Sequence, residues 1–140
     1  MQLSFKGRVA LVTGAAQGIG RAIATALRQA GASVHAADID QAGVQACAGE
    51  IGALPHTGDL SDRGTARALV DDIIKTEGRL DILALAAGGV RGQVGRSIEE
   101  ISEQDWHALF KANGEGAFYL AQAAATHLNH AGSCRIATSS

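Results

Sequence analysis

The sequence is short of cysteine, of basic charge and of long apolar runs, and each shortage excludes a class of protein. No metal-ligand spacing joins its two cysteines, Cys47 and Cys134, so we expect free thiols in a reducing compartment. Twelve basic and fourteen acidic side chains give a net charge of −2, which argues against nucleic acid as a partner. The sequence shows neither a signal-peptide core nor an apolar run of membrane-spanning length. We therefore expect a cytoplasmic protein with no membrane partner.

Strand and helix signals alternate along the whole sequence. The 140 residues are enough for one domain with a buried core, and 46% of them are hydrophobic. Such alternation with short connections predicts the α/β class: a doubly wound parallel sheet of Rossmann topology, in strand order 3-2-1-4-5. The expected strands are residues 8–13, 33–38, 54–58, 80–86 and a fifth from about Cys134. The expected helices are residues 18–30, 41–50, a third from an N-cap at Ser61 to Glu77, and a long one over 102–129.

The first strand runs into a glycine-spaced turn. The apolar residues Val9–Val12 are followed by Gly14, Gly18 and Gly20 and then by a helical pattern. Glycines let backbone amides approach a pyrophosphate closely, and the helix turns its positive end toward that charge. The second strand ends on Asp38, and an acid at this place accepts hydrogen bonds from an adenosine ribose. Together these features predict a dinucleotide-binding domain.

The spacing is Gly-x-x-x-Gly-x-Gly after Thr13, and it resembles the cofactor loop of the short-chain dehydrogenase/reductase family. The resemblance implies an oxidoreductase that transfers a hydride between NAD(H) and a secondary alcohol or ketone. The residues expected to bind the cofactor are Gly14, Gln17, Gly18, Ile19, Gly20, Asp38, Ile39, Asp59, Leu60, Ala86, Ala87 and Gly88.

Asp38 is the expected selector between NAD and NADP. Its carboxylate would accept from both ribose hydroxyls of NAD and repel the 2′-phosphate of NADP. Ile39, Asp40 and Gln41 follow it and supply no cation, so the sequence favours NAD. The alternative is that Asp38 only caps the next helix, a role for which Asp40 is better placed.

Two more segments resemble cofactor-contacting parts of the family. Asp59 and Leu60 are similar to an acidic–hydrophobic pair that contacts the adenine ring, although they could also form a plain strand-to-helix turn. Leu85 and Ala86 stand where the family commonly has two asparagines. Ala87 and Gly88 still leave room for a ribose on the backbone.

The catalytic residues are expected only from the resemblance. Asn113 lies in a segment, residues 105–118, that is similar to the family's helix with a proton-relaying asparagine. Residues 135–140 resemble the strand that ends on the carbonyl-polarising serine, which is Ser140 or the following residue. The family's Tyr-x-x-x-Lys pair is expected beyond position 140, since Ala123 stands four residues after Tyr119. We therefore expect residues 1–140 to be the amino-terminal portion of a longer enzyme. No histidine spacing indicates a metal site.

In the family the helix that contains this asparagine also builds subunit interfaces, so a homo-oligomer, a dimer or tetramer, is expected. A second hypothesis is a non-catalytic dinucleotide-binding or regulatory module, if the chain truly ends at Ser140. A third is a nucleotide-dependent methyltransferase. It is disfavoured because Val12 and Thr13 stand where that class usually has an acid before its glycine loop.

Overall fold

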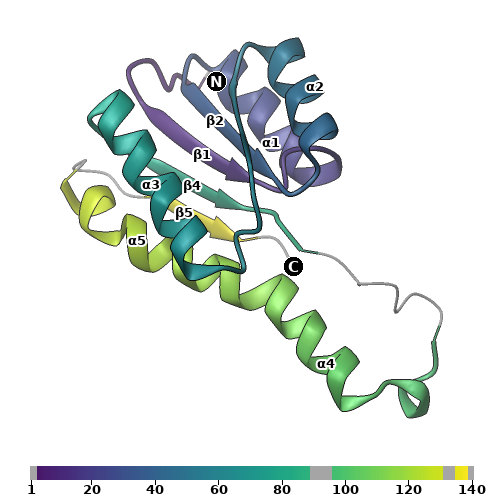
Figure 1. The fold of residues 1–140 in the computed structure, drawn as a ribbon. Coiled ribbons are helices and arrows are strands. Elements are labelled where there is room, and N and C mark those ends of the chain that lie inside the picture. Colours follow the sequence, from purple (N-terminus) through teal and green to yellow (C-terminus); the bar gives the residue numbers. More distant parts are fainter. Residues whose placement is uncertain (1–2, 89–95, 131–134, 139–140) are drawn as a thin grey trace.

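Strands and helices alternate through the structure, a computed structural model that describes residues 3–88, 96–130 and 135–138 (Figure 1). The strands are β1 (Val9–Thr13), β2 (Ser33–Asp38), β3 (Leu54–Thr57), β4 (Ile82–Leu85) and β5 (Arg135–Thr138). The α-helices are α1 (Gly18–Gln29), α2 (Gln41–Ile51), α3 (Arg63–Glu77), α4 (Glu103–Phe110) and α5 (Gly116–His130). A 3-10 turn, Ile98–Glu100, precedes α4, and a π-helical turn, Lys111–Glu115, joins α4 to α5.

The five strands form one parallel sheet in the order β3-β2-β1-β4-β5. In the register of its centre, Leu11 of β1 lies beside His35 of β2 on one side and Leu83 of β4 on the other. The order reverses between β1 and β4, and ligands of such sheets bind at the carboxyl ends of the strands at that point. The predicted fold class and strand order are confirmed.

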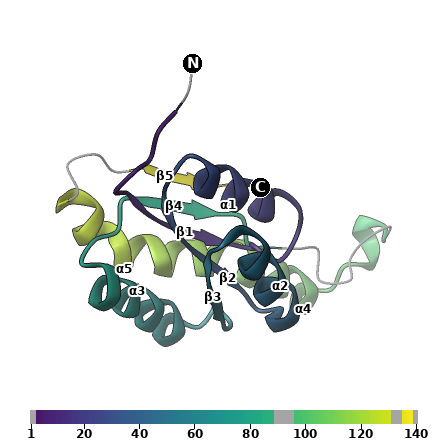
Figure 2. The same ribbon diagram turned by 90° about the horizontal axis from the view of Figure 1, so that it is seen from above.

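Helices cover both faces of the sheet (Figure 2). Alternate residues of β1 point to opposite faces: Val9 and Leu11 join the core beneath α3 and α5, whereas Ala10 and Val12 join the core beneath α1 and α2. All five residues of β1 are buried. This explains why the central strands read as continuous apolar runs rather than as alternating patterns.

Asp62, and not the predicted Ser61, is the N-cap of α3. The Asp62 carboxylate accepts a hydrogen bond from the Thr65 amide at 2.8 Å. The Ser61 hydroxyl instead donates to the carboxylate of Asp59 at 2.6 Å. Both residue types cap helices well, and the interaction with Asp59 takes Ser61 out of that role.

The long helix predicted over residues 102–129 is divided in three. It begins as expected, with Ser102 capping α4 by accepting from the Asp105 amide at 3.1 Å. The π-helical turn, called the π turn below, then interrupts the α-helical pattern before α5 starts at Gly116. In Figure 1 α5 lies along the sheet beside α3, while α4 extends beyond the sheet. The single helix was a wrong prediction in this respect.

Candidate functional site

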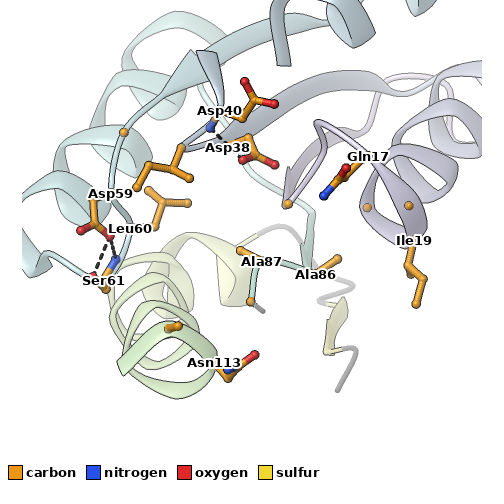
Figure 3. A pocket seen from close by; sticks show the side chains of 17 residues that line it. Gln17, Ile19, Asp38, Asp40, Asp59, Leu60, Ser61, Ala86, Ala87 and Asn113 are labelled. Atoms are coloured by element: carbon orange, nitrogen blue, oxygen red, sulfur yellow. Dashed lines mark hydrogen bonds between the residues drawn. The ribbon is translucent and has the colours of Figure 1, made fainter. Parts of the chain in front are cut away.

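A cleft of about 560 Å³ lies at the carboxyl ends of the strands, where the sheet order reverses (Figure 3). It is formed by the turn after β1, the ends of β2 and β3, the segment after β4, and the π turn. All twelve residues predicted to bind a cofactor line this cleft, as does Asn113. The lining residues not predicted from the sequence are Asp40, Gly58, Ser61 and Ala112.

The glycine turn packs backbone against backbone. Gly14 has a φ of +68°, and a Cβ there would lie 2.5 Å from the carbonyl oxygen of Ala86. A Cβ at Gly20 would overlap the carbonyl of Gly14. These two glycines therefore hold α1 close to the segment after β4.

Gly18 serves a different purpose from its neighbours in the turn. It has a φ of +58°, and a Cβ there would meet no atom of the described residues within 4 Å. It begins α1, whose N-cap residue Gln17 makes no side-chain capping hydrogen bond. The amino end of α1 thus faces the cleft without a capping side chain, and amides in this arrangement suit an anion.

Asp38 stands at the end of β2 with its carboxylate held by backbone amides. Oδ2 accepts from the amide of Ala16 at 3.0 Å, and Oδ1 accepts from the amide of Asp40 at 2.9 Å. Asp40, as predicted, caps the next helix by accepting from the Gly43 amide at 3.1 Å. Asp38 is therefore not the N-cap of α2, and two carboxylates border this end of the cleft (Figure 3).

The turn after β3 places Asp59 and Leu60 on the same side of the cleft. The amide of Gly58 donates to the carbonyl of Asp38 at 3.2 Å, which ties this turn to the end of β2. Oδ1 of Asp59 accepts from the amide of Ser61 at 3.0 Å as well as from its hydroxyl. Leu60 is buried in the core beneath α3 and α5. The turn is therefore fixed from both sides.

The family model described as short chain dehydrogenase matches residues 8–140. The chain belongs to the short-chain dehydrogenase family. It is 39% identical over 131 residues to D-threitol dehydrogenase of Mycolicibacterium smegmatis. The aligned region covers 90% of this chain and 49% of that protein. It is 32% identical over 144 residues to (3R)-3-hydroxyacyl-CoA dehydrogenase of Mus musculus, covering 94% of this chain and 54% of that protein.

A solved hydroxysteroid dehydrogenase has the same fold. The structure of 7α-hydroxysteroid dehydrogenase complexed with NADH and 7-oxo glycochenodeoxycholic acid matches with a TM-score of 0.88 and 30% identity. The match covers 98% of this chain and 54% of that one. The chain thus spans about half the length of the relatives it matches.

This member of the family has Leu85 and Ala86 where the family commonly has asparagines, at the end of β4. Leu85 is buried in the core that includes Leu120 of α5, so an apolar contact occupies this place. The neighbouring backbone is still held, because the amide of Ala87 donates to the hydroxyl of Thr13 at 3.2 Å. The segment keeps its position at the cleft without the asparagine side chains.

Asn113 reaches the cleft from the π turn. Its Nδ2 donates to the carbonyl of Leu109 at 2.8 Å. A Cβ at Gly88 would overlap Oδ1 of Asn113, so the absence of a side chain at Gly88 allows this close approach. The second predicted catalytic residue, Ser140, lies outside the described residues. Its role and that of Asn113 stay predictions.

Sequence reasoning missed a buried carboxylate at the amino ends of the strands, on the side of the sheet away from the cleft. Asp81, 1% exposed, accepts from the amide of Val9 at 2.8 Å, from Arg79 at 2.6 and 2.8 Å, and from Arg8 at 3.2 Å. Burial acts to raise the pKa of Asp81, but these hydrogen bonds outweigh it, so the pKa lies below its usual value. The only hint nearby in the sequence is that a basic residue, Arg79, and the acidic Asp81 flank Leu80.

A second missed group joins β2, β3 and α3. His35 is 2% exposed. Its Nδ1 lies 2.8 Å from Nε2 of His56 and its Nε2 lies 2.9 Å from Oε1 of Glu77, which also accepts from Ser33. Burial, and then the nearby charge of His35, lower the pKa of His56. Hydrogen bonds from His35 and Ser33 lower the pKa of Glu77. These histidines connect elements of the fold.

Residues 3–88, 96–130 and 135–138 contain neither a membrane-spanning helix nor a cluster of metal ligands. No helix in that part of the chain is long and apolar enough to cross a membrane. In the same part, no three His, Cys, Asp or Glu side chains gather in a way that could hold a metal ion.

Proposed function

We propose that this chain is the cofactor-binding portion of an NAD-dependent oxidoreductase that acts on a secondary alcohol or ketone. The observation that carries the proposal is one cleft into which the glycine turn, Asp38 and Asn113 converge. In this proposal a later segment supplies the family's Tyr-x-x-x-Lys pair.

The residues present fit a dinucleotide. Gly18 leaves open space in front of its backbone, which a pyrophosphate would occupy at the amino end of α1. Asp38 and the Asp59–Leu60 pair would hold the adenosine, with Ile39 beside it and Gln17 and Ile19 bordering the pyrophosphate. Ala86, Ala87 and Gly88 would carry the second ribose on their backbone. Together these residues make up the proposed binding site.

Asp38 supports NAD rather than NADP. Two unit charges about 4 Å apart in a partly wet site repel by roughly 1 to 4 kcal/mol, which is about fivefold to several-hundredfold in affinity. Asp40 lies on the same border of the cleft and adds charge of the same sign. A 2′-phosphate on the ribose would therefore meet two carboxylates.

When bound, the nicotinamide supplies or accepts the hydride. The chain's own contribution to the reaction is positional. Asn113, fixed by its bond to Leu109, would hold a water on the proton path. A serine at the end of β5, Ser140 or the next residue, would polarise the substrate carbonyl. The tyrosine would exchange the substrate proton, and the lysine would lower the tyrosine's pKa.

We further propose that the enzyme is a homo-oligomer, a dimer or tetramer, of the cytoplasm. Three aromatic side chains of α4 and α5 are more than half exposed: Trp106 at 54%, Phe110 at 60% and Phe118 at 59%. Exposed aromatic groups of this kind are typical of protein interfaces. The free, buried thiol of Cys47 suits a reducing compartment.

Steady-state kinetics of the full-length protein tests the cofactor and the reaction together. We expect turnover of ketones with NADH and a preference for NAD over NADP that Asp38→Ala narrows. Asp38→Asn serves as a control that removes the charge and keeps the size of the side chain. A wild-type preference for NADP would contradict the role of Asp38. Nucleotide binding without turnover of any alcohol or ketone would favour a non-catalytic module.

A further inference from the structure

Gly116, the first residue of α5, lies directly against the turn that follows β3. A Cβ at this position would be 3.0 Å from the carbonyl oxygen of Leu60, 3.2 Å from its carbonyl carbon and 3.5 Å from the amide nitrogen of Ser61. Even the attractive Cα–H···O=C contacts between backbone segments keep carbon and oxygen about 3.3–3.6 Å apart. A methyl group at Gly116 would therefore press on the peptide group that joins Leu60 to Ser61.

That peptide group cannot move away freely. The side chain of Leu60 is 9% exposed and packs in the core beneath α3 and α5. On one side of the turn, the amide of Gly58 is bound to the carbonyl of Asp38. On the other side, the amide of Asp62 donates to the carbonyl of Asp59 at 3.1 Å, and Asp62 caps α3. A displacement at Leu60 must be taken up within the turn itself.

The same peptide group orients the carboxylate of Asp59. The amide of Ser61, which belongs to this peptide, donates to Oδ1 of Asp59 at 3.0 Å (Figure 3). A shift of the peptide therefore moves the partner that fixes the Asp59 side chain at the border of the cleft. Gly116 itself does not line the cleft, so it acts on a ligand indirectly. The contact with Leu60 leads to the adenosine side of the cleft, whereas the π turn before Gly116 leads to Asn113.

We propose that Gly116 is a positioning residue for the adenosine half of the cofactor. Its missing side chain lets α5 support the Leu60–Ser61 peptide, which in turn aims the Asp59 carboxylate at the adenine. This inference rests on the proposed function, because it takes the cleft to hold a dinucleotide with its adenosine beside Asp59. It assigns a role in nucleotide affinity to a residue outside the cleft.

Gly114→Ala is the matched control for Gly116→Ala. Both glycines lie within two residues of each other at the junction of the π turn and α5, and both substitutions add a methyl group to a helical backbone. Within the part of the chain that the structure describes, a Cβ at Gly114 would meet no atom within 4 Å. Both variants gain the higher helix propensity of alanine, whereas only Gly116→Ala creates the contact with Leu60.

The experiment measures the full-length enzyme with NADH and with the reduced mononucleotide NMNH, which carries the hydride but lacks the adenosine. We expect Gly116→Ala to raise KM for NADH about fivefold, the effect of losing one ordinary hydrogen bond, with kcat unchanged. The inhibition constant of ADP-ribose should rise by the same factor, whereas KM for NMNH should stay at the wild-type value. Gly114→Ala should match the wild type in all three measurements.

A double-mutant cycle tests the route through Asp59. In an Asp59→Ala background, Gly116→Ala should add no further loss of affinity for NADH, because the side chain it disturbs is gone. Additive losses would overturn the proposal. Equal losses with NADH and NMNH would also overturn it, as would unchanged kinetics or a Gly116→Ala protein that does not fold. An inactive wild type that binds no nucleotide would instead refute the proposed function.

Discussion

Asp81 lies at the amino ends of the strands, away from the cleft, and binds Val9, Arg8 and Arg79. We expect Asp81→Ala to destabilise the folded protein. The substitution leaves the amide of Val9, a residue only 4% exposed, without its hydrogen-bond acceptor. An unsatisfied buried amide costs about 1–3 kcal/mol. Arg8 and Arg79 keep contact with water, since their side chains are 38% and 44% exposed. Each loses a pair worth only about 0–1 kcal/mol.

The expected loss in the free energy of unfolding is therefore about 1–5 kcal/mol, with the Val9 amide as the largest part. Asp81→Asn is the control, because its amide oxygen can still accept from Val9 while the charge is lost. We expect it to cost roughly half as much. Urea unfolding of the full-length protein, followed by circular dichroism at neutral pH, measures both losses.

Two results would refute this reasoning about Asp81. One is a loss below about 0.5 kcal/mol for Asp81→Ala, the usual effect of a surface substitution. The other is a loss for Asp81→Asn as large as that for Asp81→Ala. The pH dependence gives an independent check. Because the folded-state pKa is lowered, the stabilisation is complete above the unfolded value of about 3.9 and is lost as the pH falls through the folded pKa.

Three further predictions concern the cleft, the histidine pair and the exposed aromatics. Gly18→Val should abolish NADH binding in calorimetric titration. Gly78→Val should leave binding intact and is the control, because position 78 also has a positive φ and open space. Equal affinities of the two variants for NADH would mean that the glycine turn binds no cofactor. The pKa of His56 is lowered in the folded protein, so the unfolded chain takes up this proton first as the pH is lowered. The urea concentration at the midpoint of unfolding should therefore decrease as the pH is lowered from about 7 to 5. His56→Gln should flatten that slope, and an unchanged slope would exclude His56 as its source. Phe110→Asp should shift the protein to a smaller species in size-exclusion chromatography, and an unchanged elution volume would place the interface elsewhere.

The cleft could be predicted closely from sequence because its parts are local patterns. Gly14, Gly18 and Gly20 are spaced within one turn, and Asp38 is marked by the end of an apolar run. Parallel strands bring their carboxyl ends to one edge, so residues that end different strands meet there without any knowledge of side-chain packing. For this reason the predicted residues line one cleft.

The missed features depend on pairs that are distant in sequence. His35 meets His56 and Glu77 only because β2, β3 and α3 are neighbours in space, and no spacing along the chain indicates that meeting. Asp81 likewise pairs with a strand more than seventy residues away. The predicted N-cap at Ser61 failed for a smaller reason, since Asp59 competes for its hydroxyl.

The π turn also determines the direction in which the aromatic side chains of α4 point. A series of residues follows steps of three or four along both helices: Trp106, Phe110, Asn113, Ala117, Leu120, Ala124 and Leu128. In one unbroken α-helix these would form a single stripe. The extra residue of a π turn rotates the helix before it by about 100° relative to the helix after it. Leu120 and Leu128 are 1% exposed, while Trp106 and Phe110, on the helix that extends beyond the sheet, are more than half exposed. Deleting one residue from the turn would rotate α4 about its axis relative to α5. The number of residues between Phe110 and Leu120, and not their side chains, therefore determines the direction in which Trp106 and Phe110 point.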